Sequence, residues 1–195
     1  MFVLTADQRG SRTDRDRVPE ILARGRMPGM LRAFERTAGD EVQAVFDGAE
    51  QVASTALDLA DSGSWSVGIG VGAVEDPLPD QTRAGRGEAF VSARDAVESA
   101  KRNRWHLSVF GESEWCGHAQ TAAWLLLDLL ADRSDAGREA VRLVAEGMTQ
   151  SAAAGLLNIS PQAMSLRVRH ARWDVQQPAE DLLVRLLRCA DGGIA

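Results

Sequence analysis

The spacing of hydrophobic residues changes several times along the first part of the chain, as it does when strands alternate with helices. Residues 2–6 form a short apolar run rich in strand formers, and the segment 7–11 has the composition of a turn. Toward the end of the segment 36–46, apolar residues alternate with more polar ones, which is the period of a half-buried strand. Because Gly39 and Asp40 come just before this alternation, the segment predicts a β-hairpin with these two residues at its turn.

The other elements predicted in this part of the chain include one ambiguous segment. Residues 17–34 have apolar positions at helical spacing, although Gly25, Pro28 and Gly29 interrupt the pattern. The mixed order of helices and strands predicts an α+β sandwich in which the helices cover one face of the sheet. The remaining predicted elements are a helix at 49–61, a strand at 65–74, a loop rich in Pro, Gly and Arg at 77–87, a helix at 88–101 and a strand at 105–110.

The pattern changes after residue 111, and from residue 119 onward it predicts only helices. The chain is therefore predicted to divide into an α+β domain at 1–115 and an all-helical domain at 116–195. The segment 124–130 is strongly apolar, so its helix is expected to be buried either against the first domain or against a second subunit. The predicted helices lie at about 119–132, 137–146, 149–157, 161–173 and 179–189.

Two of these helices carry local signals for a tight turn between them. Thr149 is predicted to cap the first helix, and the alanines at 152–154 give it a small surface that a second helix can approach closely. Asn158 follows, and Asn tolerates the left-handed conformation that such a turn requires. Ser160 is predicted to cap the next helix, with Pro161 at its first position. Together these residues predict a helix-turn-helix.

The second helix of this motif has two chemically different faces. Met164, Val168 and Ala171 recur at helical spacing and are expected to face inward. The opposite face has groups that pair with base edges, since Gln bonds to adenine, Arg to guanine and Ser to either. Arg167 and Arg172 are expected to hold phosphates instead. The predicted DNA-binding residues are Thr149, Gln150, Ser160, Gln162, Ala163, Ser165, Leu166, Arg167, Arg169 and Arg172.

The segment 147–167 resembles the helix-turn-helix of sigma-factor region four and of related regulators. Their pattern runs Thr-Gln, a small Ala, Leu-Gly-Ile-Ser, and then an apolar residue and Arg. Asn158 stands here in place of the usual Gly, and Ala152 in place of the frequent Glu. The resemblance implies a DNA-binding helix-turn-helix at 149–173, and the alternative is a plain helical hairpin within a bundle.

The charge of the chain narrows the kind of nucleic-acid contact that is expected. The formal net charge is −6, which argues against a generic binder of polyanions. The segment 147–173, however, contains no acidic residue and carries three arginines. This is the composition of a small DNA-reading surface, although a solvated helix face would have it too.

Composition also bears on where the protein is expected to act. No stretch approaches the roughly 20 apolar residues that a membrane-spanning helix needs. The apolar start at 1–4 runs directly into charged residues, unlike a signal peptide. The two cysteines, Cys116 and Cys189, are far apart and indicate no disulfide framework. We therefore expect a cytoplasmic protein with no membrane partner.

Two carboxylates are predicted to approach each other in the first domain. Asp7 ends the first predicted strand, and Asp40 lies at the tip of the predicted hairpin. Carboxylates in such positions can share a divalent cation, Mg²⁺ or Mn²⁺, and position the oxygens of a triphosphate. The alternative is turn chemistry, because Asp favours strand ends and hairpin tips whatever it binds.

Residues 1–110 resemble the class III adenylyl and guanylyl cyclases. Segments 3–11 and 37–46 resemble the metal-binding motifs of that family, and segments 67–75 and 87–97 resemble its following strand and helix. The resemblance implies a ferredoxin-like cyclase fold, head-to-tail dimerisation and a site for a nucleotide or a metal ion. The residues that it places in this site are Asp7, Arg9, Arg36, Asp40 and Arg94, with Asp7 and Asp40 as the metal ligands.

The chain departs from the cyclase pattern at the residues that serve catalysis. Arg36 stands at the position of the family's purine-selecting Lys, and Val91 and Asp95 stand at the positions of its Asn and Arg. An anion in place of a cation opposes catalysis where the charge of the triphosphate develops. The resemblance therefore implies a domain that keeps a metal or nucleotide site and has lost turnover. Its combination with a helix-turn-helix resembles the SatD-like regulators of actinobacteria.

These patterns lead to one main expectation and two alternatives. We expect a transcriptional regulator that binds double-stranded DNA as a homodimer, because one helix-turn-helix makes too few base contacts for high affinity. Its cyclase-like domain would sense a nucleotide or a metal ion. The first alternative is an active nucleotide cyclase, which would use Asp7, Asp40 and a surrogate cation such as Arg94. The second is a protein-interaction module whose helical end binds RNA polymerase or another regulator.

Overall fold

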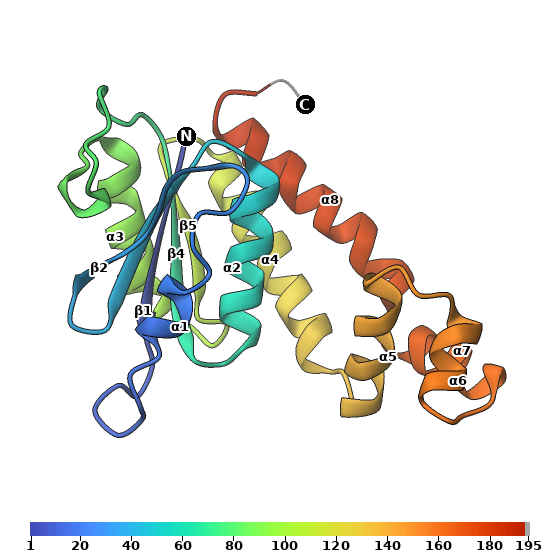
Figure 1. The fold of residues 1–195 in the computed structure, drawn as a ribbon. Helices are drawn as coiled ribbons and strands as arrows, with labels where there is room; N and C mark the ends of the chain where they lie inside the picture. Colours follow the sequence, from blue (N-terminus) through green and yellow to red (C-terminus); the bar gives the residue numbers. More distant parts are fainter. Residues whose placement is uncertain (194–195) are drawn as a thin grey trace.

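The computed structural model describes residues 1–193, which contain a five-stranded mixed sheet (Figure 1). The strands are β1 (Phe2–Gln8), β2 (Met30–Ala38), β3 (Glu41–Phe46), β4 (Trp65–Val71) and β5 (Leu107–Phe110). They lie in the order β2-β3-β1-β4-β5, and all neighbours are antiparallel except β4 and β5, which are parallel. With the helices in the connections, the chain begins with the β-α-β-β-α-β order of a ferredoxin-like unit. The predicted α+β class is confirmed.

The main hydrophobic core lies on one face of the sheet, beneath three long helices. Alternate strand residues point into this core, among them Leu4, Phe46 and Ile69, which are almost completely buried, as the two-residue period of a strand requires. The last of the three helices packs along both of the others (Figure 1). The three helices are α2 (Ala49–Asp61), α4 (Trp115–Ala131) and α8 (Trp173–Ala190).

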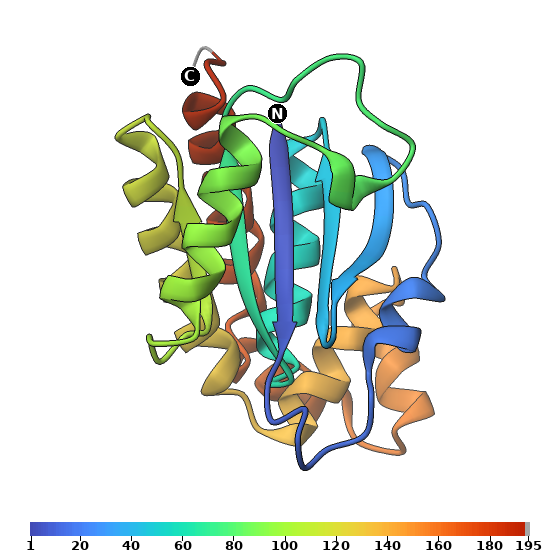
Figure 2. The same ribbon diagram turned by 90° about the vertical axis from the view of Figure 1, so that its left-hand side faces the viewer.

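Helix α3 (Glu88–Ala100) covers the opposite face of the sheet (Figure 2). Val3 of β1 and Phe90 of α3 belong to a second, smaller core on this side. The helix lies close to β4 because Gly68 and Gly70 place no side chain between the strand and the helix. The prediction that the helices cover one face of the sheet is therefore wrong, since β4 is buried on both faces.

The segment before the hairpin is mostly not helical. Helix α1 (Val18–Leu22) has only five residues, and the chain then bends at Gly25 and Gly29, which both have positive φ. Strand β2 starts directly afterwards and pairs with β3 up to the predicted turn. The hairpin prediction is confirmed. The helical spacing predicted over 17–34 is wrong beyond α1, because the last residues of this range pair with β3 instead.

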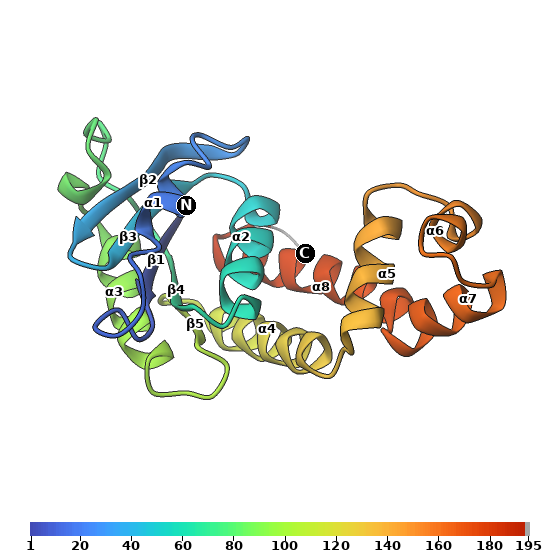
Figure 3. The same ribbon diagram turned by 60° about the horizontal axis from the view of Figure 1, so that its bottom comes forward.

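Three short helices form a separate unit that projects from the sheet (Figure 3). They enclose their own small hydrophobic core, apart from the core beneath the sheet, and we name residues 134–172 the HTH unit. Helices α4 and α8 contribute instead to the core of the sheet, so the described part of the predicted second domain, residues 116–193, belongs to two cores. The helices of the HTH unit are α5 (Asp135–Ala145), α6 (Gln150–Leu156) and α7 (Pro161–His170).

The apolar helix α4 is buried against the sheet. Trp124 Nε1 donates a hydrogen bond to the carbonyl oxygen of Leu107 in β5 at 2.7 Å, and its ring stacks on Trp105 with 4.1 Å between the ring centroids. This helix was expected to pack either against the first domain or against a second subunit, and in the structure it packs against the first domain. Leu125 on its outer side remains exposed. Although α4 is strongly apolar, no helix among residues 1–193 is long and apolar enough to cross a membrane.

Two connections join the HTH unit to the rest of the molecule, one before α5 and one after α7. Arg133 bridges them, because its Nε donates to the carbonyl oxygen of Ala171 at 2.7 Å and its Nη2 donates to Gln176 Oε1 at 2.6 Å. Arg138 of α5 forms an ion pair with Asp61 of α2, with 2.7 Å between Nη1 and Oδ2. Charge-assisted contacts of this kind hold two parts of a chain in a defined orientation.

Candidate functional site

The two helices of the helix-turn-helix begin at the residues predicted to cap them. Thr149 Oγ1 accepts a hydrogen bond from the backbone N–H of Ala152 at 3.2 Å. Ser160 Oγ accepts one from the backbone N–H of Ala163, also at 3.2 Å. Asn158 between them has a φ of 51°, the left-handed conformation that the turn requires. The cap and turn predictions are therefore confirmed, and the two caps mark where α6 and α7 begin.

The inner face of α7 holds the helix against α5 and α6. Met164 is completely buried, and Val168 and Ala171 are nearly so. Met164 lies in the core of the HTH unit together with Leu143 of α5 and Ala154 of α6. The residues predicted to face inward do so, and the opposite face of α7 is left to solvent.

The outer face of α7 is free to contact another molecule. Gln162, Ser165 and Arg169 are exposed, and within residues 1–193 their side chains form no hydrogen bond or ion pair. Because their spacing of three and four residues places them along one side of the helix, they form a continuous strip. Leu166 beside the strip is 47% exposed. Figure 3 shows α7 at the end of the molecule farthest from the sheet.

The other predicted DNA-binding residues of the turn region are also near this strip. Thr149 and Gln150 are exposed at the start of α6, and Ser160 is exposed at the start of α7. Ala163 is half-buried. The helix-turn-helix therefore presents hydroxyl, amide and guanidinium groups toward solvent, and these are the groups that contact bases and phosphates.

The two arginines predicted to hold phosphates have partners within the molecule. Arg167 Nη1 lies 3.7 Å from Glu139 Oε2, and Arg172 Nη2 lies 3.6 Å from Asp132 Oδ2. Ion pairs of this length at the surface are weak, so a phosphate group can replace either carboxylate. The HTH unit has five arginines against three carboxylates, although the whole chain has a net charge of −6.

Asp7 and Asp40 lie at the same end of the sheet. The backbone N–H of Gln8 donates to the carbonyl oxygen of Asp40 at 3.0 Å, and both aspartates line one hollow of about 460 Å³. Burial raises the pKa of Asp7, and the nearby Asp40 carboxylate adds to this effect, whereas Lys101 opposes it. The hollow is also lined by Gln8, Arg9, Gly10, Ser11, Arg12, Ser66, Lys101 and His106.

The structure does not bring all five predicted nucleotide-binding or metal-binding residues together. Arg9 lines the hollow with Asp7 and Asp40, but its Nη1 donates to a backbone carbonyl group at 2.9 Å. Arg36 lines a neighbouring hollow of about 500 Å³, and its Nη2 pairs with Asp16 Oδ2 at 2.6 Å. Arg94 is exposed on α3 and lines neither hollow.

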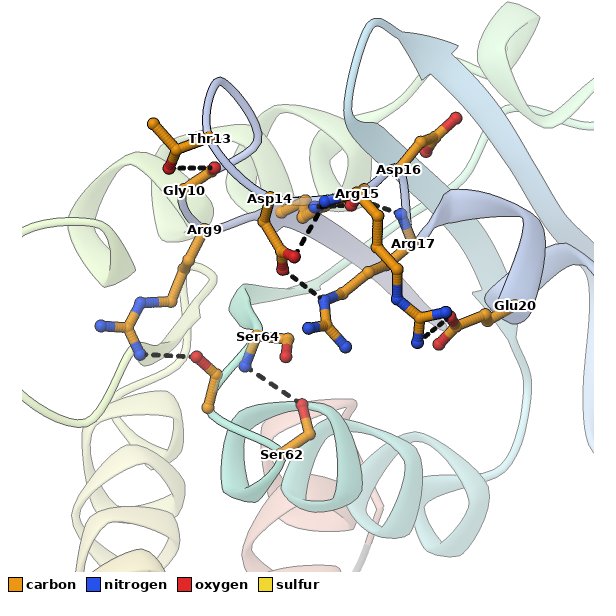
Figure 4. Close-up of polar contacts among 12 residues, drawn as sticks. Arg9, Gly10, Thr13, Asp14, Arg15, Asp16, Arg17, Glu20, Ser62 and Ser64 are labelled. Carbon is orange, nitrogen blue, oxygen red and sulfur yellow. Dashed lines mark hydrogen bonds and ion pairs between the residues drawn. The ribbon is translucent and has the colours of Figure 1, made fainter.

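The loop between β1 and α1 carries further arginines, and Figure 4 shows two of them, Arg15 and Arg17, paired with carboxylates of the same segment. Arg15 pairs with Glu20 at 2.6 Å, and Arg17 pairs with Asp14 at 2.7 Å. Arg12 lines both hollows, and it has no carboxylate within ion-pair distance in the described part of the chain. Arg12 is therefore available to an anion, whereas Arg9 already donates to a backbone carbonyl group.

Lys101 is a residue of this site that sequence reasoning missed. Its Nζ lies 2.9 Å from Asp7 Oδ2 and 2.7 Å from Glu98 Oε1. Burial lowers the pKa of Lys101, but hydrogen bonds to Glu98 and Asp7 outweigh burial and raise it. The residue follows α3, far along the chain from Asp7, so no local motif connects the two. Composition offered a signal, because this is the only lysine among the 22 lysines and arginines of the chain.

Two surfaces of the chain therefore have the chemistry of a binding site. The strip on α7 presents groups that suit base edges, and the hollow beside Asp7 presents charged groups of both signs. Comparison of the chain with protein-family models, with curated proteins and with solved structures finds no match.

Proposed function

We propose that this chain is a transcriptional regulator that binds double-stranded DNA through its HTH unit. The observation that carries the proposal is the strip of Gln162, Ser165 and Arg169, which is exposed and without intramolecular partners on a well-capped second helix. A helix of this kind has the dimensions to enter the major groove, with its first residues toward the base edges. The separate core of the HTH unit supports the same function, because it keeps α7 clear of the sheet.

The chemistry of the strip suggests how bases would be read. Gln162 suits adenine, and Arg169 suits guanine or a phosphate. The exposed Leu166 suits the methyl group of thymine. Arg167 and Arg172 would exchange their surface carboxylates for phosphates of the DNA backbone.

The regulator is proposed to act as a homodimer. A single short recognition helix contacts only a few base pairs, and two copies on successive major grooves supply the affinity that one lacks. The half-sites would then be separated by about one helical turn, roughly 34 Å, or by a multiple of it.

The hollow beside Asp7 and Asp40 is proposed as the place where an effector such as a nucleotide binds. Support comes from the size of the hollow and from Arg12, which is available to a phosphate group. Cyclase turnover is not part of the proposal, because Val91 and Asp95, at the positions that the cyclase resemblance assigns to catalysis, are exposed on α3 and outside the hollow.

Substituting Arg169 by alanine is expected to weaken DNA binding by about 1–3 kcal/mol, or roughly five- to 150-fold. The reason is that a guanidinium group bonded to a base or a phosphate is lost from the strip, while α7 keeps its buried face. A duplex is first obtained by selection from a randomised library with the wild-type protein. Fluorescence anisotropy over a range of salt concentrations then measures the affinity, which should fall steeply with salt.

Arg185→Ala is the matched control, because Arg185 is an exposed arginine of α8 outside the HTH unit. It removes the same charge and should leave DNA affinity within a factor of about two, since a single distant charge is screened by salt. Failure of the wild-type protein to enrich any duplex would contradict the proposal, as would equal affinities of the Arg169→Ala variant and the wild type. A cyclic product from ATP or GTP with Mg²⁺ or Mn²⁺ would favour the cyclase alternative.

A further inference from the structure

The only lysine of the chain, Lys101, lies beside Asp7, one of the two carboxylates predicted to bind a metal ion. Its ammonium group lies between Asp7 Oδ2 at 2.9 Å and Glu98 Oε1 at 2.7 Å. The Asp7 side chain is about one-fifth exposed and that of Lys101 about one-third, so the pair is partly shielded from solvent. Shielding strengthens an ion pair relative to one on the open surface.

The choice of lysine is informative in a chain that uses arginine elsewhere. Lysine presents a compact ammonium group with three donors, whereas arginine presents a planar fork that suits bidentate pairing. A compact cation can contact two carboxylates from different directions, as Lys101 does with Asp7 and Glu98. The Lys101 ammonium group therefore contacts these carboxylates in the way that a small bound cation would.

With Lys101 in place, the ligands beside Asp7 do not suit a divalent metal ion. Mg²⁺ and Mn²⁺ prefer several oxygen ligands, and within residues 1–193 no group of three or more His, Cys, Asp or Glu side chains is arranged to hold a metal. One carboxylate of the predicted pair, Asp7, already has Lys101 as its partner. Arg9 and Arg12 line the same hollow and add positive charge.

We propose that Lys101 is the built-in cation of this site and that its ammonium group excludes divalent metal ions from Asp7 and Asp40. The site then differs from the metal site that the cyclase resemblance implies. An anionic ligand of this hollow would be held by Lys101 and Arg12 directly, without a bridging metal. This inference is independent of DNA binding by α7, which is on another part of the molecule.

Mn²⁺ binding to the full-length protein tests the proposal, with free Mn²⁺ measured by electron paramagnetic resonance. The wild type is expected to show no Mn²⁺ binding that depends on Asp7, judged against Asp7→Asn. Lys101→Gln should gain a site at least roughly tenfold tighter than any in the wild type, because the repelling ammonium group is gone. The gain should disappear in the double variant Asp7→Asn/Lys101→Gln.

Arg102→Gln is the matched control, since it removes the same charge from the neighbouring exposed residue. It should gain no Mn²⁺ site. Equal gains in Arg102→Gln and Lys101→Gln would overturn the proposal, as would no gain in a folded Lys101→Gln variant. If Lys101→Gln fails to fold, the comparison of the wild type with Asp7→Asn decides alone. Mn²⁺ binding by the wild type that is lost in Asp7→Asn would overturn the proposal. A wild type without such Asp7-dependent binding would agree with it.

Discussion

Replacing Gly70 with alanine is expected to lower the free energy of unfolding by at least about 3 kcal/mol. A β-carbon at this position would lie 2.0 Å from the carbonyl oxygen of Ala89 and 2.3 Å from the backbone nitrogen of Ala93. Both atoms belong to the backbone of α3, which cannot rotate aside as a side chain can, so the helix must move away from β4. Denaturant unfolding followed by circular dichroism measures the loss. The corresponding fall in Tm is roughly 6–12 °C for a chain of this size.

Gly117→Ala is the matched control for this experiment. Gly117 lies inside α4, and apart from the adjacent backbone of its own helix a β-carbon there would have no atom within 4 Å. Alanine is favoured over glycine inside a helix by about 0.5–1 kcal/mol, so this variant should be slightly more stable than the wild type. Opposite signs for the two substitutions are therefore expected. Unchanged stability of the Gly70→Ala variant would show that α3 does not pack closely on β4.

The glycines of β4 explain why the sequence predicted the individual helices and strands better than it predicted which face of the sheet each helix covers. The segment 49–61 is found as α2, since its apolar positions repeat at the period of a helix. In β4 the residues between the apolar ones are Ser66, Gly68 and Gly70, and they form a second buried face. Small residues in a strand mark the close approach of another backbone. The small residues of β4 thus indicate that helices pack on both faces of the sheet.

The helix-turn-helix was predictable because its signals are local. Thr149 and Ser160 accept hydrogen bonds within their own turns, and the conformation of Asn158 depends on its own side chain and its neighbours. The orientation of the unit depends instead on contacts between residues far apart in the chain, namely those of Arg133 with Ala171 and the ion pair of Arg138 with Asp61. The spacing of apolar residues carries no information about pairs so far apart in the chain. These contacts could therefore be identified only from the structure.

The site beside Asp7 shows the same division between local and distant information. The strand end and the hairpin tip indicated that Asp7 and Asp40 would be neighbours, and the structure places both on one hollow. The partner of Asp7 could not be read from those two motifs, because Lys101 reaches it from the end of α3. The topology of the sheet, with β4 beside β1, is what brings α3 and its lysine to this edge.

The two hydrophobic cores have a consequence for stability. The core of the HTH unit shares no residue with the core beneath the sheet, and the connections before α5 and after α7 are short. A defect confined to the smaller core should therefore open the HTH unit while the sheet domain stays folded, because local unfolding follows contiguous packed units. This offers a way to separate DNA binding from the fold of the sheet domain.

Substituting Met164 by aspartate is expected to unfold the HTH unit and to abolish DNA binding. Met164 is completely buried between α5 and α6, and a carboxylate there has no cation or donor to compensate for its lost hydration, which costs at least several kcal/mol. Hydrogen exchange measured by mass spectrometry should show that α5, α6 and α7 lose protection while β1 and β4 keep it. Fluorescence anisotropy on the selected duplex should detect no binding.

Met164→Leu is the matched control, because it conserves the volume and apolar character of the side chain and should cost less than about 1.5 kcal/mol. This variant should keep both the protection of α7 and the DNA affinity. Two results would contradict the reasoning in different ways. Loss of protection in β1 and β4 of the Met164→Asp variant would show that the two cores unfold together. Wild-type DNA affinity in that variant, with α7 unprotected, would show that the contact surface for DNA is elsewhere in the chain.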